Sequence, residues 1–326
     1  QQEHGFEGLL LHHVGKVAEI LIFLIGAMTI VELIDLHRGF DVLKDMVKTK
    51  SKIRLLWITG IVGFILSAVI DNLTATIVLI SLLRKLVNNR EERIWYVSLI
   101  VIAANAGGAW SPIGDVTTTM LWIAKKVTAG GLSEYIIIPA ILCFVVPFAL
   151  ASRMKIFKGN IEIVEKTNEE REKLLSSKTM LWVGLGAIVF VPIFKTLTHL
   201  PPYVGMMLSL GVVWMVSEYI HPEDNFDKSR KHLYSANKAL SRIEISSILF
   251  FLGILMAVAA LESLVFGSIK GQEVGTLRFA AESISNAIPS MDIVVILLGI
   301  LSAIIDNVPL VAASMGMYTY EIDHSI

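Results

Sequence analysis

Residues 66–72 are Leu-Ser-Ala-Val-Ile-Asp-Asn, and residues 301–307 are Leu-Ser-Ala-Ile-Ile-Asp-Asn. Six of these seven positions are identical, and the seventh exchanges valine for isoleucine. Apolar residues match by chance in many chains, but a Ser-x-x-x-Asp-Asn pattern shared by two apolar stretches requires an explanation. The two stretches therefore predict an internal repeat.

The composition places this repeat in a membrane protein. Hydrophobic residues make up 54% of the 326 residues, and glycine adds 23 more, whereas soluble domains contain roughly 45–50% apolar residues with glycine included. Charged residues are only 17%, and the mean hydropathy is +0.68. These values exclude a disordered chain, a nucleic-acid-binding protein and an ordinary cytosolic enzyme. We therefore expect the lipid bilayer, and no nucleic acid, as a partner.

Apolar stretches that are long enough to cross about 30 Å of hydrocarbon cover most of the chain. The clear ones are 17–36, 94–124, 134–151, 179–197, 203–220 and 244–262. The connections 37–54, 84–93, 152–178 and 221–242 hold 22 of the 28 Lys and Arg residues. Because basic connections stay on the cytoplasmic side of a membrane, these four are predicted to be cytoplasmic.

The first two basic connections are consecutive, so the stretch between them, 55–83, must enter and leave the membrane on the same side. Its 29 residues are too few for two full spans of about 20 residues each. The sequence therefore predicts a re-entrant hairpin over 55–83 with Asp71 near its polar tip. The alternative is one long tilted helix with a buried aspartate.

Counting the spans that follow the basic connections predicts that the second copy of the motif, within 292–320, enters the membrane from the opposite side. This arrangement predicts an inverted-topology repeat, the usual construction of secondary transporters, whose ion sites lie near the midplane at broken helices. We expect a first repeat over 1–151 and a second over 179–326, joined by a cytoplasmic loop at 152–178. The second repeat is expected to be incomplete at its C-terminal end, because a symmetric protein would continue with another broken helix. The segment 263–291 is amphipathic and is expected along the interface.

The span 94–124 is unusual because glycines and polar residues fill its centre. Residues 103–119 are Ala-Ala-Asn-Ala-Gly-Gly-Ala-Trp-Ser-Pro-Ile-Gly-Asp-Val-Thr-Thr-Thr. Such a sequence would not stay in a regular helix, and it predicts an unwound segment between two half-helices. Hard cations take oxygen ligands, and the candidate ligands here are Asn105, Ser111, Asp115, Thr117 and Thr118. The alternative is a kinked helix whose polar side chains bond to their neighbours.

Three aspartates, Asp71, Asp115 and Asp306, lie deepest in the expected spans. An ionised carboxylate at the centre of a membrane helix costs about 2.5–3.5 kcal/mol on insertion scales, so such residues are functional by default. Burial favours the protonated form of a carboxylate, so one site could hold either a proton or a cation. Mutually exclusive occupancy is the simplest mechanism of exchange.

Other residues are weaker candidates. Glu32 closes the first span, where it could be intramembrane or could form an interfacial salt bridge with a basic segment. His12, His13 and His37 lie at membrane edges, where a hydrated interfacial position is expected and pH sensing is the alternative. The sequence contains no P-loop, Rossmann glycine pattern or His/Cys metal spacing, so we expect no cofactor and no ATP-driven pumping. Cys143 is the only cysteine and cannot form an intrachain disulfide.

Four segments together resemble the NhaD-type sodium/proton antiporters of the ion transporter superfamily, and the resemblance covers nearly the whole chain. They are Gly26-Ala-Met-Thr-Ile-Val-Glu32, Ile70-Asp71-Asn72-Leu-Thr74-Ala-Thr76, residues 104–118 and Ile305-Asp306-Asn307-Val-Pro309. The resemblance implies an all-α polytopic membrane protein with two re-entrant hairpins and two broken helices, which exchanges Na⁺ or Li⁺ for H⁺. It implies a bacterial inner membrane or, less favoured, a chloroplast envelope. Many such carriers dimerise, so a homodimer is an open expectation.

The resemblance also implies a set of transport residues. By motif match these are Asp71, Asn72, Thr74, Asn105, Asp115, Thr117, Thr118, Asp306 and Asn307. The Na⁺ ligands among them would be Asp71, Asn72, Asn105, Asp115, Asp306 and Asn307, and Ser67, Ser111, Ser302 and Glu32 are secondary candidates. The family continues past the second Asp-Asn with a glycine-rich broken helix, which this chain lacks.

Two other functions are considered. A sodium-coupled anion carrier of the dicarboxylate type belongs to the same superfamily, but three intramembrane aspartates would repel a dianion, and no Lys or Arg lies at a span centre. An intramembrane aspartyl protease needs two membrane aspartates, and Ile113-Gly114-Asp115 is superficially similar to such a motif. Proteolysis would not need the repeated Asp-Asn pair. The expectation is therefore a secondary transporter rather than an enzyme.

Overall fold

The computed structural model describes residues 2–46, 49–161, 174–220, 233–269, 272–288 and 290–317. Helices dominate these residues, so the prediction of an all-α membrane protein is confirmed. Four helical segments are long and apolar enough to span a bilayer: Leu10–Leu36, Ala129–Ala151, Ser176–Thr198 and Ile245–Ser263. The chain forms two compact units, and each is described by itself. The larger unit comprises 25–118 and 129–243, and the smaller comprises 1–24, 119–128 and 244–326.

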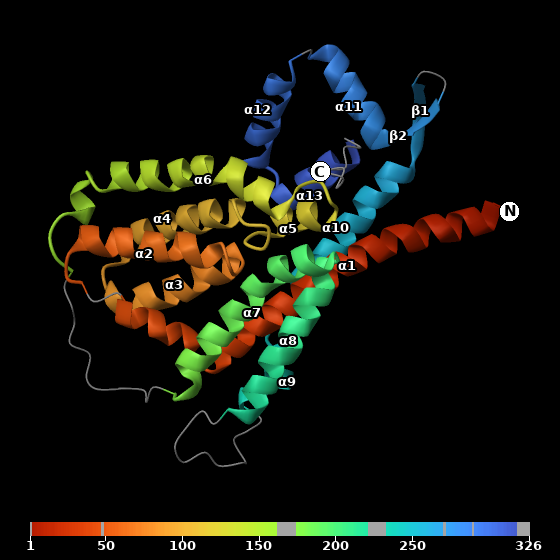
Figure 1. Ribbon diagram of the computed structural model, residues 1–326. Helices are drawn as coiled ribbons and strands as arrows, with labels where there is room; N and C mark the ends of the chain where they lie inside the picture. Colours follow the sequence, from red (N-terminus) through yellow and green to blue (C-terminus); the bar gives the residue numbers. More distant parts are fainter. Residues whose placement is uncertain are drawn as a thin grey trace. The chain divides into compact units, whose positions relative to one another are not determined.

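The centre of the larger unit is a helical hairpin packed on a third helix. Helix α2 (Lys52–Ser67) and helix α3 (Asn72–Leu86) contact each other, and both contact α4 (Arg90–Ala109) (Figure 1). The Cβ position of Gly63 in α2 lies 3.0 Å from Leu79 Cδ1 in α3, so a glycine allows the two helices to pack closely. The break predicted within 55–83 is therefore present between α2 and α3.

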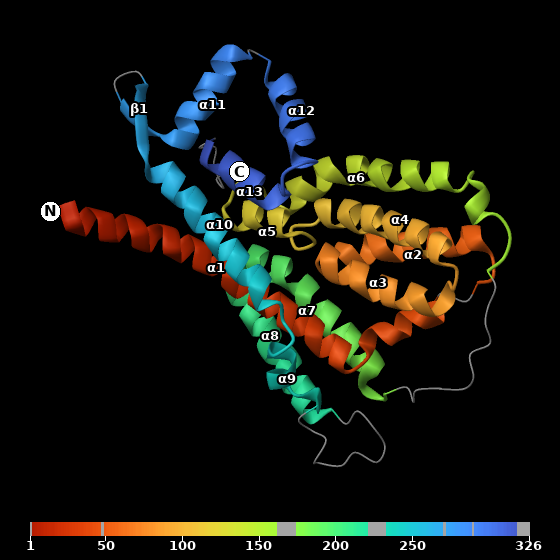
Figure 2. The same ribbon diagram turned by 180° about the vertical axis from the view of Figure 1, so that it is seen from behind.

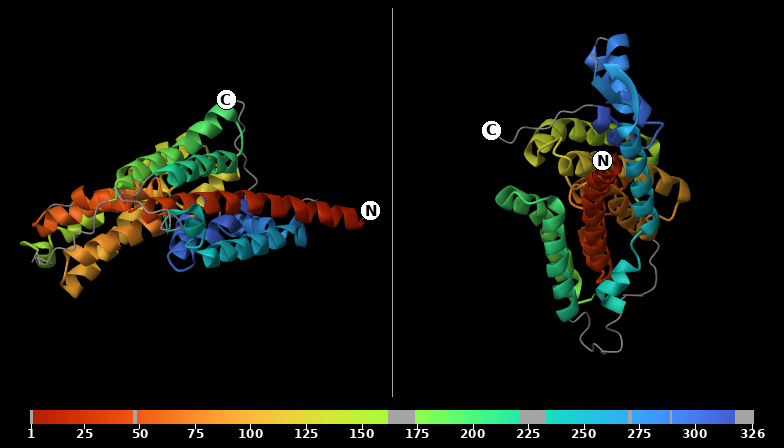
Figure 3. Two further views of the ribbon diagram at one scale, coloured as in Figure 1. Left: turned by 90° about the horizontal axis from the view of Figure 1, so that it is seen from below. Right: turned by 90° about the vertical axis from the view of Figure 1, so that its right-hand side faces the viewer.

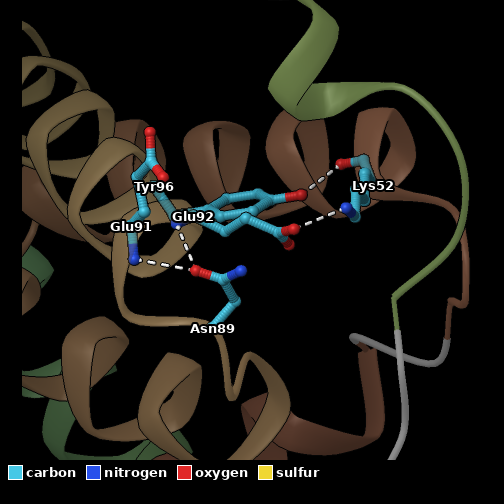
Figure 4. A network of polar contacts seen from close by, with 5 residues as sticks. All are labelled: Lys52, Asn89, Glu91, Glu92 and Tyr96. Carbon is cyan, nitrogen blue, oxygen red and sulfur yellow. Dashed lines mark hydrogen bonds and ion pairs between the residues drawn. The ribbon is translucent and has the colours of Figure 1, made fainter.

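The base of this hairpin is held by polar contacts to the start of α4 (Figure 4). Lys52 Nζ lies 2.6 Å from Glu92 Oε1, and the hydroxyl of Tyr96 donates to the Lys52 carbonyl at 2.7 Å. Asn89 caps α4, because its side-chain oxygen accepts from the backbone amides of Glu91 and Glu92. The break between α2 and α3 lies at the opposite end of the hairpin from these contacts.

The predicted interruption of the span 94–124 is also present. Helix α4 ends at Ala109, and α5 (Val116–Ile123) begins after six non-helical residues, 110–115. Pro112 and Gly114 lie in this linker, where residues of low helix propensity are expected. Ser133 of α6 (Ala129–Ala151) donates its hydroxyl to the Trp110 carbonyl at 3.1 Å, which anchors the linker.

Helix α4 also contacts α6, so it is covered by helices on more than one side (Figure 2). The chain then forms the short 3₁₀ helix η2 (Lys155–Phe157). The apolar core of this part of the larger unit includes Leu55, Leu79, Tyr96, Phe144 and Phe148, all buried.

The rest of the larger unit is built on the second half of α1 (Gln2–Leu36). The 3₁₀ helix η1 (Gly39–Met46) contacts α7 (Ser176–Thr198), and α7 runs beside α8 (Pro202–Tyr219) (Figure 3). A methyl group on Gly184 of α7 would come within 2.5 Å of Ile34 Cδ1, so α1 and α7 pack tightly at this glycine. The short helix α9 (Ala236–Leu240) contacts α8.

The position of His37 corrects an expectation. A hydrated interfacial side chain is wrong for this residue, because His37 is completely buried. It lies one residue after α1, among side chains from α7 and α8. His12 is exposed and His13 is partly exposed, and a hydrated position for these two residues stays a prediction.

The smaller unit contains the second copy of the motif. Helix α10 (Ile245–Ser263) leads into an antiparallel hairpin of β1 (Val265–Ile269) and β2 (Gln272–Gly275), followed by α11 (Thr276–Ala287). Helices α12 (Met291–Ser302) and α13 (Asn307–Met317) then contact each other, and α13 also contacts α10 and α11. The predicted second hairpin, 292–320, is thus two helices with a break, and its last three residues lie outside the described residues.

The breaks in the two copies have the same backbone hydrogen bonds. Ile70 N donates to the Leu66 carbonyl at 2.9 Å, and Ile305 N donates to the Leu301 carbonyl at 2.9 Å. The residues that close α2 and α12, Ala68 and Ala303, have nearly equal backbone angles, with φ of −71° and −72°. Repetition in the sequence is therefore accompanied by repetition of local backbone structure.

Candidate ion-binding site

The first copy of the motif places Asp71 at the start of α3. Asp71 is the N-cap of this helix: its Oδ1 accepts from the Thr74 amide at 2.8 Å, and its Oδ2 accepts from the Thr74 hydroxyl at 2.5 Å. Aspartate is a favoured N-cap residue, and a negative charge at a helix N-terminus is stabilised by the helix dipole. The sequence Asp-x-x-Thr thus both starts the helix and orients the carboxylate.

Asp115 has an equivalent role at the start of α5. Its Oδ1 accepts from both the amide of Thr117, at 2.8 Å, and the hydroxyl of Thr117, at 2.5 Å. The hydroxyl of Thr118 donates to the Asp115 backbone carbonyl at 2.9 Å. Asp115, Thr117 and Thr118 are all buried. The threonines singled out from the sequence therefore hold the aspartate in place in this structure.

Asn72 joins these two helix starts. Its side-chain nitrogen donates to Asp115 Oδ2 at 2.7 Å and to Asn105 Oδ1 at 2.9 Å. Asn105, in α4, donates its own side-chain nitrogen to the Val101 carbonyl at 2.8 Å. The predicted residues Asp71, Asn72, Asn105 and Asp115 are therefore connected through hydrogen bonds and the chain itself, although 33 residues separate Asn72 from Asn105 and 43 separate it from Asp115.

Three glycines allow the linker 110–115 and the end of α4 to approach the end of α2. A methyl group on Gly114 would come within 2.8 Å of Gly108 Cα, and one on Gly108 would come within 2.5 Å of the Gly114 carbonyl oxygen. At Gly107 a methyl group would overlap the backbone of Phe64. In the sequence these glycines are recognisable only as residues that interrupt a helix. Their second role, close backbone packing, depends on a partner that the sequence does not reveal.

Ser67 lies beside this glycine contact. Its side chain is completely buried, and its Oγ has no hydrogen-bond partner among the described residues. The Ser67 Oγ is 3.2 Å from the Cβ position of Gly108. Buried hydroxyl groups are nearly always hydrogen-bonded, so an unpartnered one next to backbone carbonyls marks a place where a ligand could add a contact.

The other candidates are distributed differently. Ser111 is buried in the linker, and its Oγ accepts from the Ile113 amide at 3.3 Å. In the smaller unit Asp306 is exposed, and its Oδ1 accepts from the Val308 amide at 3.1 Å. Asn307 is the first residue of α13, and Ser302 is the last residue of α12. The position that matches Thr74 is Pro309, which has no amide proton to donate, so Asp306 bonds one residue earlier.

Glu32 takes part in an ion-pair cluster. Arg242 Nη1 lies 3.6 Å from Glu32 Oε2 and 3.3 Å from Asp35 Oδ2. Arg242 belongs to the basic connection 221–242, so the geometry matches the salt-bridge interpretation of Glu32.

The side chains of Asp71, Asn72, Asn105 and Asp115 are chemically suited to bind a cation. Two carboxylates and two side-chain amides supply oxygen atoms, which are the ligands that hard cations prefer. Both carboxylates lie at helix N-termini, where the helix dipole stabilises negative charge. An anion would meet two carboxylates here, so the site suits a small cation or a proton.

Several known proteins are similar in sequence to this chain. A family model described as "Citrate transporter" matches residues 8–323. Two Arabidopsis thaliana proteins, sodium/proton antiporter 1 and sodium/proton antiporter 2, are 44% and 42% identical over 95% of this chain, and the matches cover 51% and 71% of their own lengths. The Na(+)/H(+) antiporter NhaD of Alkalimonas amylolytica is 29% identical over 95% of this chain and 66% of its own length.

The chain spans about half the length of the first of these relatives. The relatives are named as antiporters, which are secondary transporters rather than enzymes, and the resemblance to NhaD-type antiporters is confirmed. With the family model matching nearly the whole chain, the helical membrane protein described above belongs to the citrate transporter family.

Proposed function

We propose that this protein exchanges Na⁺ for H⁺ across a membrane, with the two ions competing for the carboxylates of Asp71 and Asp115. The observation that carries the proposal is the hydrogen bond from Asn72 to Asp115, which joins the starts of α3 and α5. It gathers oxygen ligands from two interrupted helices at one place. The names of the relatives support sodium and protons as the transported ions.

The exchange follows from the donors and acceptors of the site. The nitrogen of Asn72 now donates to Asp115 Oδ2 and to Asn105 Oδ1. A cation that binds these two oxygens must displace that nitrogen, and rotation of the Asn72 amide would then offer its own oxygen. A proton on Asp115 would remove the negative charge that attracts the cation. Loading with one ion therefore opposes loading with the other.

Ser67 completes the proposed ligand set of the first copy. Its buried, unpartnered hydroxyl lies beside Gly108 and Gly114, whose carbonyls face the same close contact. Backbone carbonyls at an interrupted helix are typical cation ligands in transporters built from repeats. We place Ser111 outside this set, because its Oγ accepts a hydrogen bond within the linker.

We further propose that Asp306, Asn307 and Ser302 act as ion ligands in the second repeat. Their support is the identical backbone bonding at the two breaks. The re-entrant course of both hairpins, the inverted topology and the division into repeats over 1–151 and 179–326 belong to the same proposal.

The proposal also covers the membrane that contains the protein, a second transported cation and the oligomeric state. Relatives come from both a plant and bacteria, so a bacterial inner membrane remains a prediction with a chloroplast envelope as its alternative. Li⁺ as a second cargo and a homodimer are also predictions. Ion competition tests the first, and the mass of the protein in detergent tests the second.

Exchange is measured in everted vesicles that contain the full-length protein. Respiration acidifies the interior, and a pH-sensitive dye reports proton release after NaCl is added. We expect dequenching with NaCl and none with choline chloride at equal ionic strength. Sodium-dependent uptake of labelled citrate without proton release would instead indicate the anion carrier and overturn the proposal.

A further inference from the structure

His37 occupies a buried junction of three helices in the larger unit. Its Nδ1 lies 2.9 Å from the Oγ of Ser176, the first residue of α7, and its Nε2 lies 3.1 Å from the Oγ of Ser217, in the last turn of α8. The hydroxyl of Ser177 donates to the His37 backbone carbonyl at 2.8 Å. One residue after α1 thus contacts the beginning of α7 and the end of α8.

The hydrogen-bond network assigns the proton on the ring. The hydroxyl of Ser217 donates to the Tyr234 carbonyl at 3.1 Å. Since a serine has only one hydroxyl proton, Ser217 must accept from His37 Nε2–H. A neutral imidazole has one N–H, so Nδ1 is the acceptor and the Ser176 hydroxyl donates to it. In the neutral form both ring nitrogens are therefore hydrogen-bonded, with Ser217 as acceptor and Ser176 as donor.

Among the described residues, no carboxylate lies within hydrogen-bond distance of either ring nitrogen of His37. Both ring nitrogens face hydroxyl groups, and the ring of Tyr234 packs 5.4 Å from the imidazole. Asp35 pairs with Arg242, and Arg38 with Asp41. Burial lowers the pKa of His37 from 6.5 to about 4, although the Tyr234 carbonyl opposes this effect. Of the charged groups next to the two serines in the chain, Lys178 of α7 is exposed and Glu218 of α8 is half-buried.

We propose that His37 is an acid-sensitive latch that joins the end of α1 to α7 and α8 while its ring is neutral and releases them when it is protonated. A second ring proton, on Nδ1, would force the Ser176 hydroxyl to turn from donor to acceptor. The cation would also be buried, with no carboxylate of a described residue at hydrogen-bond distance. This proposal does not depend on ion exchange, because the latch lies in other helices than Asp71 and Asp115.

The direction of the pH effect follows from the two states. The histidine of the unfolded chain titrates near 6.5, and that of the folded protein near 4. The latch is therefore fully effective above about pH 6.5, and its contribution falls as the pH drops toward about 4. As the pH falls from about 6.5 to about 4, His37 should raise the unfolding equilibrium constant by about tenfold for each pH unit, or about 300-fold in total.

The first test compares thermal unfolding of the purified protein in detergent at about pH 7.5, 6, 5 and 4. His37→Gln cannot be protonated. At about pH 7.5 this variant should unfold at a lower temperature than the parent, but its unfolding temperature should fall less when the pH is lowered. His12→Gln, at an exposed histidine of α1, is the matched control and should retain the parent slope. His37→Asn replaces the glutamine variant if that variant does not accumulate. An unchanged slope in these His37 variants would overturn the proposal.

The second test measures the latch at neutral pH. Cys143→Ser removes the only cysteine, and Leu181→Cys then reports on a buried position of α7 that packs near Gly39 of η1. We expect His37→Phe to accelerate alkylation of this cysteine by at least about tenfold, which corresponds to local opening. Leu79→Cys, buried in α3, should keep its protection. Equal protection at both positions after His37→Phe would contradict the latch.

Discussion

Asn72 donates one side-chain amide to two acceptors, Asp115 Oδ2 at 2.7 Å and Asn105 Oδ1 at 2.9 Å. These contacts connect the start of α3 to the start of α5 and to the end of α4. A residue beside the hairpin break thereby sets the position of a buried carboxylate in another interrupted helix. The first predictions concern this link.

Replacing Asn72 by alanine should reduce Na⁺-dependent proton release by at least about tenfold. The change leaves Asp115 Oδ2 and Asn105 Oδ1 without their shared donor, and a lost hydrogen bond to a charged group is worth about 1.5–3 kcal/mol. Dequenching rates in everted vesicles measure the effect. Asn89→Ala removes an exposed helix cap and should leave the rate per molecule nearly unchanged. Equal rates for the two variants would argue against the link.

Removing the charge from either carboxylate of the first copy should abolish exchange. Asp115→Asn and Asp71→Asn keep the shape of the side chain but not its negative charge, which a bound cation requires. Expression and unfolding temperature show whether each variant folds. Asp292→Asn, at an exposed aspartate of α12, is the control. Unimpaired exchange by Asp71→Asn at normal expression would remove that residue from the site.

Gly114→Ala should destabilise the protein and impair exchange together. The added methyl group would lie 2.8 Å from Gly108 Cα, and backbone atoms cannot rotate away, so we expect a cost of about 1–3 kcal/mol. Gly211→Ala in α8 meets open space and should be neutral or slightly stabilising. Unfolding temperatures of the two variants, measured side by side in detergent, test this difference. A neutral Gly114→Ala would show that the linker can relax.

The contact between Lys52 and Glu92 should contribute measurably to stability. Their side chains are 15% and 17% exposed, and the Lys52 carbonyl also accepts from Tyr96. We expect Lys52→Met alone to cost about 1–3 kcal/mol, because it leaves Glu92 charged and poorly solvated. The double variant Lys52→Met with Glu92→Gln should recover part of that loss. Strictly additive effects in this double-mutant cycle would indicate that the pair contributes nothing.

Local sequence determined the order of helices and interruptions. Gly107, Gly108, Pro112 and Gly114 disfavour a continuous helix, and Asp71 starts a helix because its carboxylate caps the following turn. Such effects act within a few residues, so the apolar pattern, the glycines and the basic connections were sufficient to predict the interruptions, whereas the cap at Asp71 was first seen in the structure. The candidates Asp71, Asn72, Asn105 and Asp115 were identified for the same reason: polar groups are conspicuous in apolar stretches.

Tertiary structure decided which distant groups meet. Nothing in the local pattern shows that Asn72 reaches Asp115, that Gly114 packs on Gly108 and the end of α2, or that Arg242 pairs with Glu32. His37 is the clearest case: its position after a span predicts a hydrated side chain, but Ser176 and Ser217 satisfy its ring in the interior. Composition determines what a segment can form, whereas long-range packing determines which of its polar groups lose water and which partners replace that water.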